Sequence, residues 1–357
     1  MKCKLEDIAD VTMGQSPKSE YYNIEGKGYP FLQGNRTFGF KYPNFDTYTT
    51  VMTKSAKAGD VIMSVRAPVG DLNITPVDMC LGRGVCSLRM KNGNQDFLFY
   101  MMKYYVPHLL KKESGTVFGS VNRNDINGLE VDIPEDAQVQ KKIARYLEMI
   151  DDKIELNNAI NNNLEQQAQT IFDSMFPNIS NGENTIGDTI TPKRGKGLLS
   201  QNAVFGNVPV VAGGLEPSTY HNTANTKAPV LAISASGANA GFVSLWNIPI
   251  WSSDSSFIDS SMTDDVYFWY VLLKKRQREI YDSQTGSAQP HIYPQHIAAM
   301  PISDLNFDDV RNYTSIVTPI FEMIGHNKDE NAQLTTTRDA LLPKLMSGEL
   351  DVYDIEV

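Results

Sequence analysis

Two long segments of the chain place apolar residues with the period of a paired helix. Across residues 139–176, apolar or small side chains recur at alternating intervals of three and four, the spacing of a coiled-coil seam. Residues 313–350 align with this segment without a gap and share Glu-Met-Ile at the same place, although their seam is less regular. The pattern predicts two long helices, over residues 139–178 and 308–350.

The seam positions are apolar apart from a few asparagines. If a two-fold axis relates the two halves, the helices pair antiparallel, and the asparagines set the register at some cost in stability. The alternative is that each helix packs only on its own domain. Arg338 falls on a seam-like position and leaves the register of the second helix open. The predicted pairing residues are Ile143, Leu147, Ile150, Ile154, Asn157, Asn161, Leu164, Ala168, Ile171 and Met175, with Val317, Phe321, Ile324, Asn331, Leu334, Leu342 and Leu345.

The stretches in front of the two helices also repeat each other. GYPFLQG at 28–34 matches NVPVVAG at 207–213, and each is a short β-like run closed by glycine. AGDVIMSVRAPVG at 58–70 matches APVLAISASGANAG at 228–241, a buried-strand pattern that breaks into a turn. An aromatic helical stretch follows in both halves. A polar loop comes next, SGTVFGSVNRNDI or TGSAQPHIYPQHI, and is expected to lead into a short strand.

The repeat predicts an α+β protein built from two related units. Each unit is a mixed α/β domain followed by a long helix, and the two helices pair as an antiparallel coiled coil. The expected divisions are a first domain at 1–138, its helix at 139–178, a second domain at 179–307, its helix at 308–350 and a tail at 351–357.

Composition agrees with two ordinary domains. The chain has 357 residues, 41% of them hydrophobic, which is enough for two cores. Its three cysteines are too few for a disulfide framework, and Cys80 and Cys86 lack nearby histidines, so buried thiols are favoured over a zinc site. No apolar run reaches the roughly 18 residues that span a membrane, and the first residues lack the apolar core of a secretory signal. The default expectation is the cytoplasm.

The formal charge of −10 is unusual for a nucleic-acid binder, because phosphate contacts favour a basic face. Its distribution weakens this objection. Residues 136–176 carry a net charge of −3 and residues 307–357 a net charge of −6, so both predicted domains are close to neutral. The charge argues against a stand-alone non-specific binder and allows a specific one that shares phosphate binding with a partner.

A search for catalytic motifs finds none of the common ones. The chain has no P-loop, no Gly-x-Gly-x-x-Gly after a strand, no Asn-Pro-Pro-Tyr or Asp-Pro-Pro-Tyr, and no His-Glu-x-x-His. We therefore expect no catalytic residues, no metal site and no cofactor in this chain.

The loops of both domains are instead rich in side chains that bond DNA bases or phosphates. Each such residue, taken singly, is more often a solvated or turn-capping side chain. Their recurrence at matching positions of the repeat favours a role in DNA binding. The candidates are Asn35, Arg36, Arg66, Ser120, Asn122 and Arg123 in the first half, and Lys193, Arg194, Lys196, Ser236, Asn239, Ser287, Gln289 and His291 in the second.

With these features, the chain resembles the specificity subunit of type I restriction–modification systems along its whole length. The most specific local feature is TRDALLPKLMSGELDV at Thr337–Val352, which is similar to the end of the family's second helix and its tail. The polar loops before the helices and IPEDAQVQKKIARYLEMIDDKIELNN at the first domain-to-helix transition support it. The chain is somewhat short for the family, which implies compact domains.

The resemblance implies a function as a non-catalytic DNA-binding subunit. Each domain would be a target-recognition domain that reads one half of a bipartite site in double-stranded DNA, with the helices as the spacer. The implied partners are modification subunits, which carry S-adenosylmethionine and methylate adenine, and optionally a restriction/translocase subunit that uses ATP and Mg. Two alternatives stay open: an adaptor or inhibitor that no longer reads DNA, and a self-contained methyltransferase.

Overall fold

The computed structural model describes residues 1–111, 119–286 and 289–353. The chain forms two compact units, a first unit of Met1–Leu156 with Glu330–Val357 and a second unit of Asn157–Asp329. Each unit therefore contains one globular domain and a part of both long helices. Within the described residues, none of the helices combines the length and the apolar character needed to cross a membrane.

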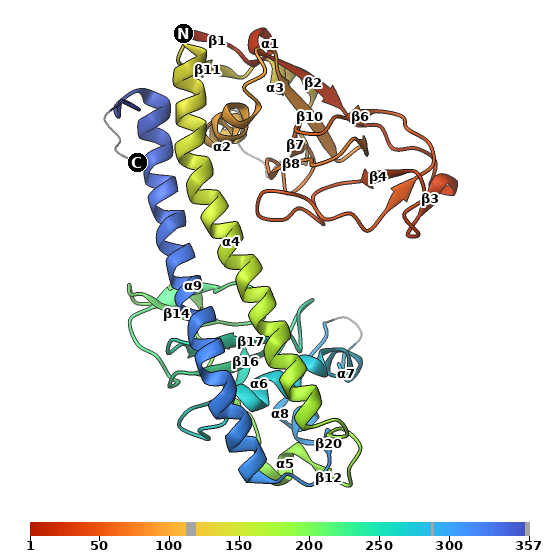
Figure 1. The fold of residues 1–357 in the computed structure, drawn as a ribbon, viewed down its shortest axis with the longest axis vertical. Coiled ribbons are helices and arrows are strands. Elements are labelled where there is room, and N and C mark those ends of the chain that lie inside the picture. Colours follow the sequence, from red (N-terminus) through yellow and green to blue (C-terminus); the bar gives the residue numbers. More distant parts are fainter. Residues whose placement is uncertain (112–118, 287–288, 354–357) are drawn as a thin grey trace. The chain divides into compact units, whose positions relative to one another are not determined.

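The first unit is built on two small sheets, and the aromatic helix α2 packs against the antiparallel one (Figure 1). The antiparallel sheet has the order β2 (Ala9–Met13), β10 (Val85–Met90), β7 (Val61–Ser64), β8 (Leu72–Ile74). The mixed sheet has the order β3 (Tyr22–Asn23), β5 (Tyr48–Thr49), β4 (Tyr29–Leu32), β9 (Met79–Leu81), β6 (Ser55–Ala56). The remaining elements are β1 (Lys2–Lys4) paired with β11 (Glu130–Asp132), and the helices α1 (Leu5–Ile8), η1 (Ser19–Tyr21), α2 (Gln95–Lys111) and α3 (Arg123–Asn127).

The second unit repeats this plan. Its antiparallel sheet has the order β13 (Lys193–Arg194), β19 (Ser255–Asp259), β16 (Val230–Ser234), β17 (Val243–Trp246), and its mixed sheet the order β15 (Thr219–His221), β14 (Val208–Val211), β18 (Trp251–Ser252). Strand β12 (Asn184–Thr185) pairs with β20 (Pro301–Ile302). The helices are α5 (Ile186–Thr189), η2 (Ser200–Asn202), α6 (Val266–Lys275), α7 (Gln277–Asp282) and α8 (Pro294–Ala298).

Strand register confirms the internal repeat residue by residue. Pro30 of β4 lies opposite Tyr48, and its repeat partner Pro209 of β14 lies opposite Tyr220. The same two strands each pair in parallel with one other strand, β4 with β9 and β14 with β18. A proline at these positions has no N–H to donate, so both copies place it where the ladder tolerates that loss.

One expectation about the repeat is wrong in detail. The polar loop does not lead directly into a strand but into a short helix, α3 in the first unit and α8 in the second, and β11 and β20 follow. The cause is local. The Asn122 side chain accepts hydrogen bonds from the backbone N–H groups of Asn124 (2.8 Å) and Asp125 (3.2 Å), and Pro294 opens α8 at the first helical turn, where its missing N–H has no cost.

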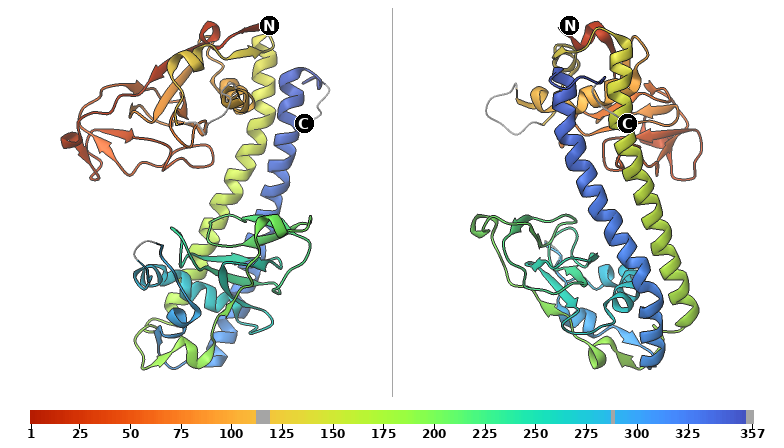
Figure 2. Two further views of the ribbon diagram at one scale, coloured as in Figure 1. Left: turned by 180° about the vertical axis from the view of Figure 1, so that it is seen from behind. Right: turned by 60° about the vertical axis from the view of Figure 1, so that its left-hand side comes forward.

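The two long helices are α4 (Ala137–Met175, 39 residues) and α9 (Phe307–Ser347, 41 residues). Within the first unit, the start of α4 and the end of α9 lie side by side (Figure 2) and share one core with α2 and the sheet, through Leu147 and Leu342 among others. Within the second unit, buried Asn161 of α4 accepts a hydrogen bond from buried Asn327 of α9 at 2.7 Å. In each unit, then, both helices pack on the globular domain and on each other.

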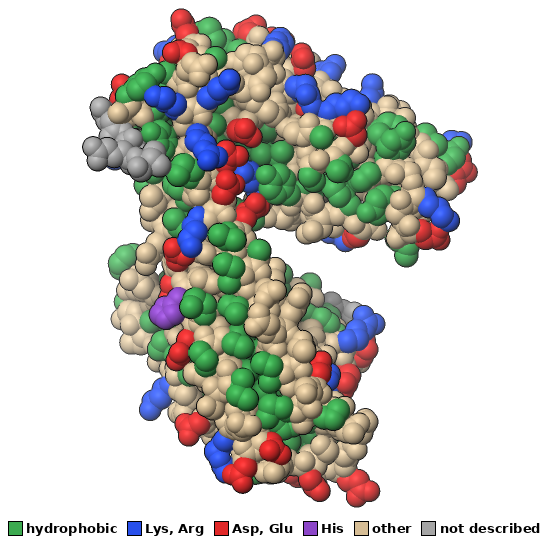
Figure 3. Space-filling model, viewed as in Figure 1, with side chains coloured by type: hydrophobic (Ala, Val, Ile, Leu, Met, Phe, Trp, Pro, Cys, Tyr) green, Lys and Arg blue, Asp and Glu red, His purple; other side chains and the backbone are tan. Residues whose placement is uncertain are grey.

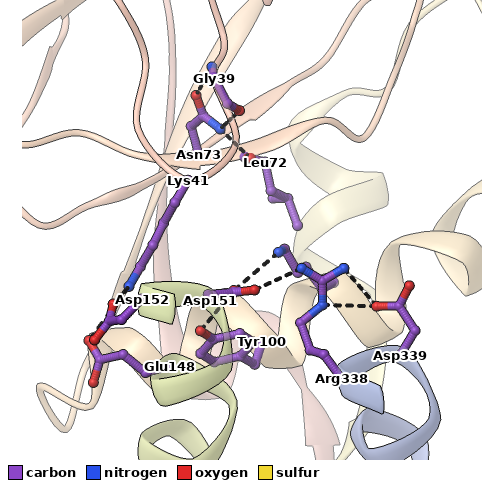
Figure 4. A network of polar contacts seen from close by, with 11 residues as sticks. Gly39, Lys41, Leu72, Asn73, Tyr100, Glu148, Asp151, Asp152, Arg338 and Asp339 are labelled. Carbon is purple, nitrogen blue, oxygen red and sulfur yellow. Dashed lines mark hydrogen bonds and ion pairs between the residues drawn. The ribbon is translucent and has the colours of Figure 1, made fainter. Parts of the chain in front are cut away.

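A buried carboxylate connects three helices of the first unit (Figure 4). Asp151 of α4 has no exposed side-chain surface. It accepts hydrogen bonds from the Tyr100 hydroxyl of α2 at 2.9 Å and from Arg338 of α9 at 2.7 Å, and Lys103 Nζ of α2 lies 3.6 Å away. Burial lowers the pKa of Lys103, and Asp151 opposes that shift. Arg338 therefore falls on the seam because it neutralises Asp151.

A second buried charge lies nearby in the same unit. Lys41, in the loop after β4, is 2% exposed and contacts two carboxylates of α4, Asp152 at 3.2 Å and Glu148 at 3.6 Å. Asn73 of β8 closes this loop by accepting a hydrogen bond from the Gly39 N–H at 3.0 Å and donating one to the Gly39 carbonyl at 2.9 Å. The loop, the sheet and α4 are thus joined by polar contacts as well as by the apolar core.

We predict that Asp151→Ala lowers the free energy of unfolding by about 3–5 kcal/mol, because it leaves the buried charge of Arg338 without its carboxylate. The control is Lys153→Ala, which removes an ion pair with Glu330 whose two side chains are both 44% exposed and should cost about 0–1 kcal/mol. Urea denaturation of the purified variants measures both. Equal losses would contradict the assignment of Asp151 as the connecting residue.

Candidate nucleic-acid interface

The first candidate surface lies on the turn that follows β7 in the first unit. Ser64 ends the strand, and its hydroxyl donates to the Pro68 carbonyl at 2.8 Å and accepts from the Asp71 N–H at 2.9 Å. Gly70 closes the turn with a φ of +98°, and a side chain there would meet Val106 of α2 at 2.5 Å. The turn is therefore a fixed support, and it presents exposed Arg66 to solvent.

Two further loops lie beside this turn. The Val65 N–H donates a hydrogen bond to the Gly84 carbonyl at 2.9 Å, and the Val65 carbonyl accepts one from the Val121 N–H at 3.0 Å. These bonds place the backbone of Arg66 in an isolated bridge with Ser120. Two residues that are 54 positions apart in the sequence, and were both predicted to bind DNA, are thus brought together.

The second unit contains the same arrangement of backbone bonds. The Ala235 N–H donates a hydrogen bond to the Asp254 backbone carbonyl at 3.1 Å, and the Ala235 carbonyl accepts one from the Ile292 N–H at 2.9 Å. Ser236 therefore forms a bridge with His291, as Arg66 does with Ser120. Gly241, with a φ of +89°, closes this turn as Gly70 closes the first. The structure again brings together two predicted residues.

Asp254 is a residue of this surface that the sequence analysis missed. Its carboxylate accepts a hydrogen bond from Arg194 of β13 at 2.5 Å and another from the Ser236 hydroxyl. The side chains of Arg194 and Asp254 are 40% and 39% exposed, so both remain accessible. The repeat held the signal that could have found it, because Asp254 occupies the place of Gly84 in the first unit.

Asn35 and Arg36 lie on the loop after β4, and both contact acidic side chains. Asn35 donates to Asp71, next to the turn of Arg66, at 2.5 Å. Arg36 forms a two-pronged ion pair with Asp46, at 2.8 and 2.6 Å, and its hydrogen bond holds the pKa of Asp46 below the usual value. A guanidinium has five N–H donors, so such a pair orients the arginine and leaves other donors available.

The remaining candidates are less closely grouped. Asn122 and Arg123 have intramolecular roles, since Asn122 caps α3 and Arg123 donates to the Val11 carbonyl. Lys193, Lys196 and Gln289 are exposed and Asn239 is half-buried. Ser287 lies outside the described residues. DNA contact by any of these side chains stays a prediction.

Charge and metal chemistry add little to this surface. Positive and negative side chains are interspersed on the faces that Figure 3 shows. Among the described residues, no group of three or more His, Cys, Asp or Glu side chains is placed to hold a metal ion. The surface offers hydrogen-bond donors and acceptors on rigid turns, which is an arrangement for recognition.

Comparison with known proteins gives consistent matches. Residues 1–166 match the family model of the type I restriction modification DNA specificity domain. The protein named as the MjaX type I restriction enzyme specificity subunit of Methanocaldococcus jannaschii is 38% identical over 173 residues, which cover 48% of this chain and 40% of that protein. The MjaIX specificity subunit of the same organism is 24% identical over 405 aligned positions, covering 99% of this chain and 94% of the relative.

A solved structure shares the fold. The S subunit of a type I restriction–modification system from M. genitalium superimposes with a TM-score of 0.58 at 19% identity, over 97% of this chain and 95% of that one.

We predict that the turn glycine of the second unit is required by both its backbone angle and its surroundings. Gly241→Ala would meet Ile280 at 2.8 Å, whereas Gly237, with a similar φ of +83°, has nothing within 4 Å. Gly237→Ala should therefore lower the free energy of unfolding by about 1–2 kcal/mol, because alanine is strained in a left-handed backbone conformation. Gly241→Ala should lower it by about 2–5 kcal/mol, because crowding against Ile280 is added. Chemical denaturation checks the order, and a larger loss for Gly237→Ala would refute it.

Proposed function

We propose that the chain is a specificity subunit of a type I restriction–modification system, which recognises a DNA target in two parts and positions a partner enzyme on it; its similarity to proteins of that family supports the proposal. Each globular domain reads one half-site. The chain itself is the non-catalytic DNA-recognition component of its complex. Its surface supports this role through hydrogen-bonding side chains held on rigid turns.

The observation that carries the proposal is one backbone arrangement with two different sets of side chains. The first unit presents Arg66 and Ser120 beside Gly84, and the second presents Ser236 and His291 beside Asp254. The backbone bonds of Val65 in the first unit recur at Ala235 in the second, while the side chains at these three positions differ. Two readers of different base sequences need this arrangement, since base edges are distinguished by their pattern of donors and acceptors.

The chemistry of the two sets suggests how they differ. Arg66 offers only donors, which suits the two acceptors of a guanine edge in the major groove. In the second unit, Asp254 and Ser236 add acceptors, which suit the amino group of cytosine or adenine. Arg194, which Asp254 holds through a hydrogen bond, supplies donors to the neighbouring base.

The partners follow from the family. Modification subunits would supply S-adenosylmethionine and methylate adenine, and a restriction subunit would bring ATP and Mg, while this chain holds no cofactor of its own. Part of the phosphate binding would fall to these partners, which accounts for the net charge of −10. Such a complex acts on the cell's DNA, and we assign it to the cytoplasm.

We also propose that α4 and α9 form an antiparallel coiled coil that fixes the distance between the half-sites. In the first unit, Asp151 pairs with Arg338 while Lys153, further along α4, pairs with Glu330, earlier in α9. In the second unit, Asn161 bonds Asn327, and the Ala168 carbonyl accepts from Tyr313 at 3.0 Å. In both units α9 therefore runs opposite to α4, and the paired asparagines and the buried Asp151 set the register.

We predict that Arg66→Ala relaxes recognition in one half-site and Arg194→Ala in the other. Each loss should amount to about 1–3 kcal/mol of discrimination at one base pair, because a bidentate contact is removed. The measurement is a genome-wide map of methylated adenines in cells that express the chain with its cognate modification subunit. Wild-type cells should show one split motif, which disappears when the chain is absent.

The outcome separates the alternatives. If wild-type cells show no motif although the complex assembles, the chain is an adaptor and the proposed function is wrong. If either arginine variant relaxes both half-sites equally, the domains do not read independently.

We predict that shortening both helices by one heptad shortens the preferred gap between half-sites without changing their sequences. Removing residues 154–160 and 328–334 keeps both the Asp151–Arg338 and the Asn161–Asn327 pairs. Seven residues correspond to about 10 Å of helix, or about three base pairs of DNA. The same methylation map reports the gap.

Deletion of residues 154–160 alone is the matched control. It shifts the two helices out of register and should impair assembly instead of changing the gap. An unchanged gap in the double deletion would refute the spacer role.

A further inference from the structure

The second unit presents one aromatic side chain almost wholly to solvent. Phe205 is 97% exposed at the tip of the loop between η2 and β14. Val204 and Tyr220 next to it are each 53% exposed, and the hollow beside Phe205 is lined by Ser200, Asn207 and Tyr220 among others. Single exposed apolar side chains are common on protein surfaces. Phe205 differs from these because its loop is held by buried contacts and has a counterpart in the first unit.

The loop that carries Phe205 is rigidly supported. The Val204 N–H donates to Nδ1 of His221, a residue of β15 that is 8% exposed, at 3.0 Å. The His221 ring packs edge-on against Trp251 at 5.0 Å between centroids. Gly206 lets the loop approach β15, because a Cβ there would lie 2.4 Å from the Asn222 Cα. The tip is therefore fixed in place while its side chain remains outside.

The first unit has the same feature at the matching place of the repeat. Ile24 is 85% exposed in the segment between η1 and β4. Its loop is closed by two hydrogen bonds of 2.9 Å, one from the Lys27 N–H to the Asn23 side chain and one from that side chain to the Lys27 carbonyl. An exposed apolar tip on a supported loop thus occurs in both units.

The charge around Phe205 indicates what covers it. Two exposed basic side chains, Lys193 and Lys196, precede Phe205 in the chain, whereas Arg194 between them pairs with Asp254. The Lys196 carbonyl accepts a hydrogen bond from Trp251 Nε1 at 2.8 Å, and the Trp251 ring packs on His221, so Lys196 is connected to the support of the Phe205 loop. A positive segment with an apolar tip matches a DNA groove, which combines phosphates with one apolar group, the methyl of thymine.

We propose that Phe205 packs on the methyl group of a thymine in the half-site read by the second unit, and that His221 positions it there. This inference rests on the proposed function. Insertion of Phe205 between base pairs is disfavoured by comparison, because unstacking a step costs a few kcal/mol that a methyl contact avoids. Phe205 thereby adds an apolar contact to the polar ones made around Asp254.

Uracil lacks the thymine methyl, so replacing each thymine of the mapped half-site in turn tests the contact. We expect the complex of wild-type chain and modification subunits to lose about threefold to tenfold in affinity at one position. The complex with Phe205→Ala should bind the thymine duplex about threefold to tenfold more weakly than the wild-type complex does. Its affinity should not fall further when that thymine is replaced by uracil. Because Phe205 is exposed, this substitution leaves the fold intact.

Ile24→Ala is the matched control, and it should leave the uracil sensitivity of this half-site unchanged. Phe205→Leu should retain part of the discrimination. The inference is wrong if Phe205→Ala keeps the wild-type response to uracil, if it weakens assembly with the modification subunits, or if the half-site contains no A·T pair. A wild-type complex without any split motif would instead refute the proposed function.

Discussion

The carboxylate of Asp151 is the contact on which the first unit depends. A charge with no exposed surface is tolerated only when paired and hydrogen-bonded, and the partners of Asp151 come from α2 and from α9. The end of α9 is therefore held on the first domain by a specific electrostatic contact as well as by apolar packing. Apolar packing alone would accept several registers of the two helices. The buried ion pair of Asp151 with Arg338 specifies one register of the two helices within this unit.

The support for recognition follows the same logic on a smaller scale. Ser64 and Ser234 are both buried and end equivalent strands, and Gly70 and Gly241 close equivalent turns through positive φ angles. The two glycines and the matching backbone hydrogen bonds of Val65 and Ala235 fix the turns, so the neighbouring positions can change without disturbing the fold. Arg66 in the first unit and its counterpart Ser236 in the second offer different hydrogen-bond donors and acceptors. The backbone hydrogen bonds of Val65 and Ala235 beside them are the same.

Sequence patterns predicted the parts of this protein that are periodic or repeated. The two long helices followed from the heptad spacing, and the relation of the domains from matched strands, where Pro30 and Pro209 even share a tyrosine opposite them. Contacts between distant residues were out of reach. Nothing local marks Asp151 or Lys41 as buried, and Asp254 matters only because Arg194 and Ser236 meet it. Phe205 was missed because an apolar residue in a loop is normally taken for core.

The acidic composition of the chain fits recognition by hydrogen bonds better than recognition by charge. Two arginines of the described surface are paired within their own unit, Arg36 with Asp46 and Arg194 with Asp254. Such pairs reduce attraction to phosphates at any sequence, and they hold the guanidinium in one orientation. If the chain acts as proposed, these pairs would lower its non-specific affinity for DNA and retain its discrimination between bases. The partner would then supply the phosphate contacts, and this chain would supply the choice of sequence.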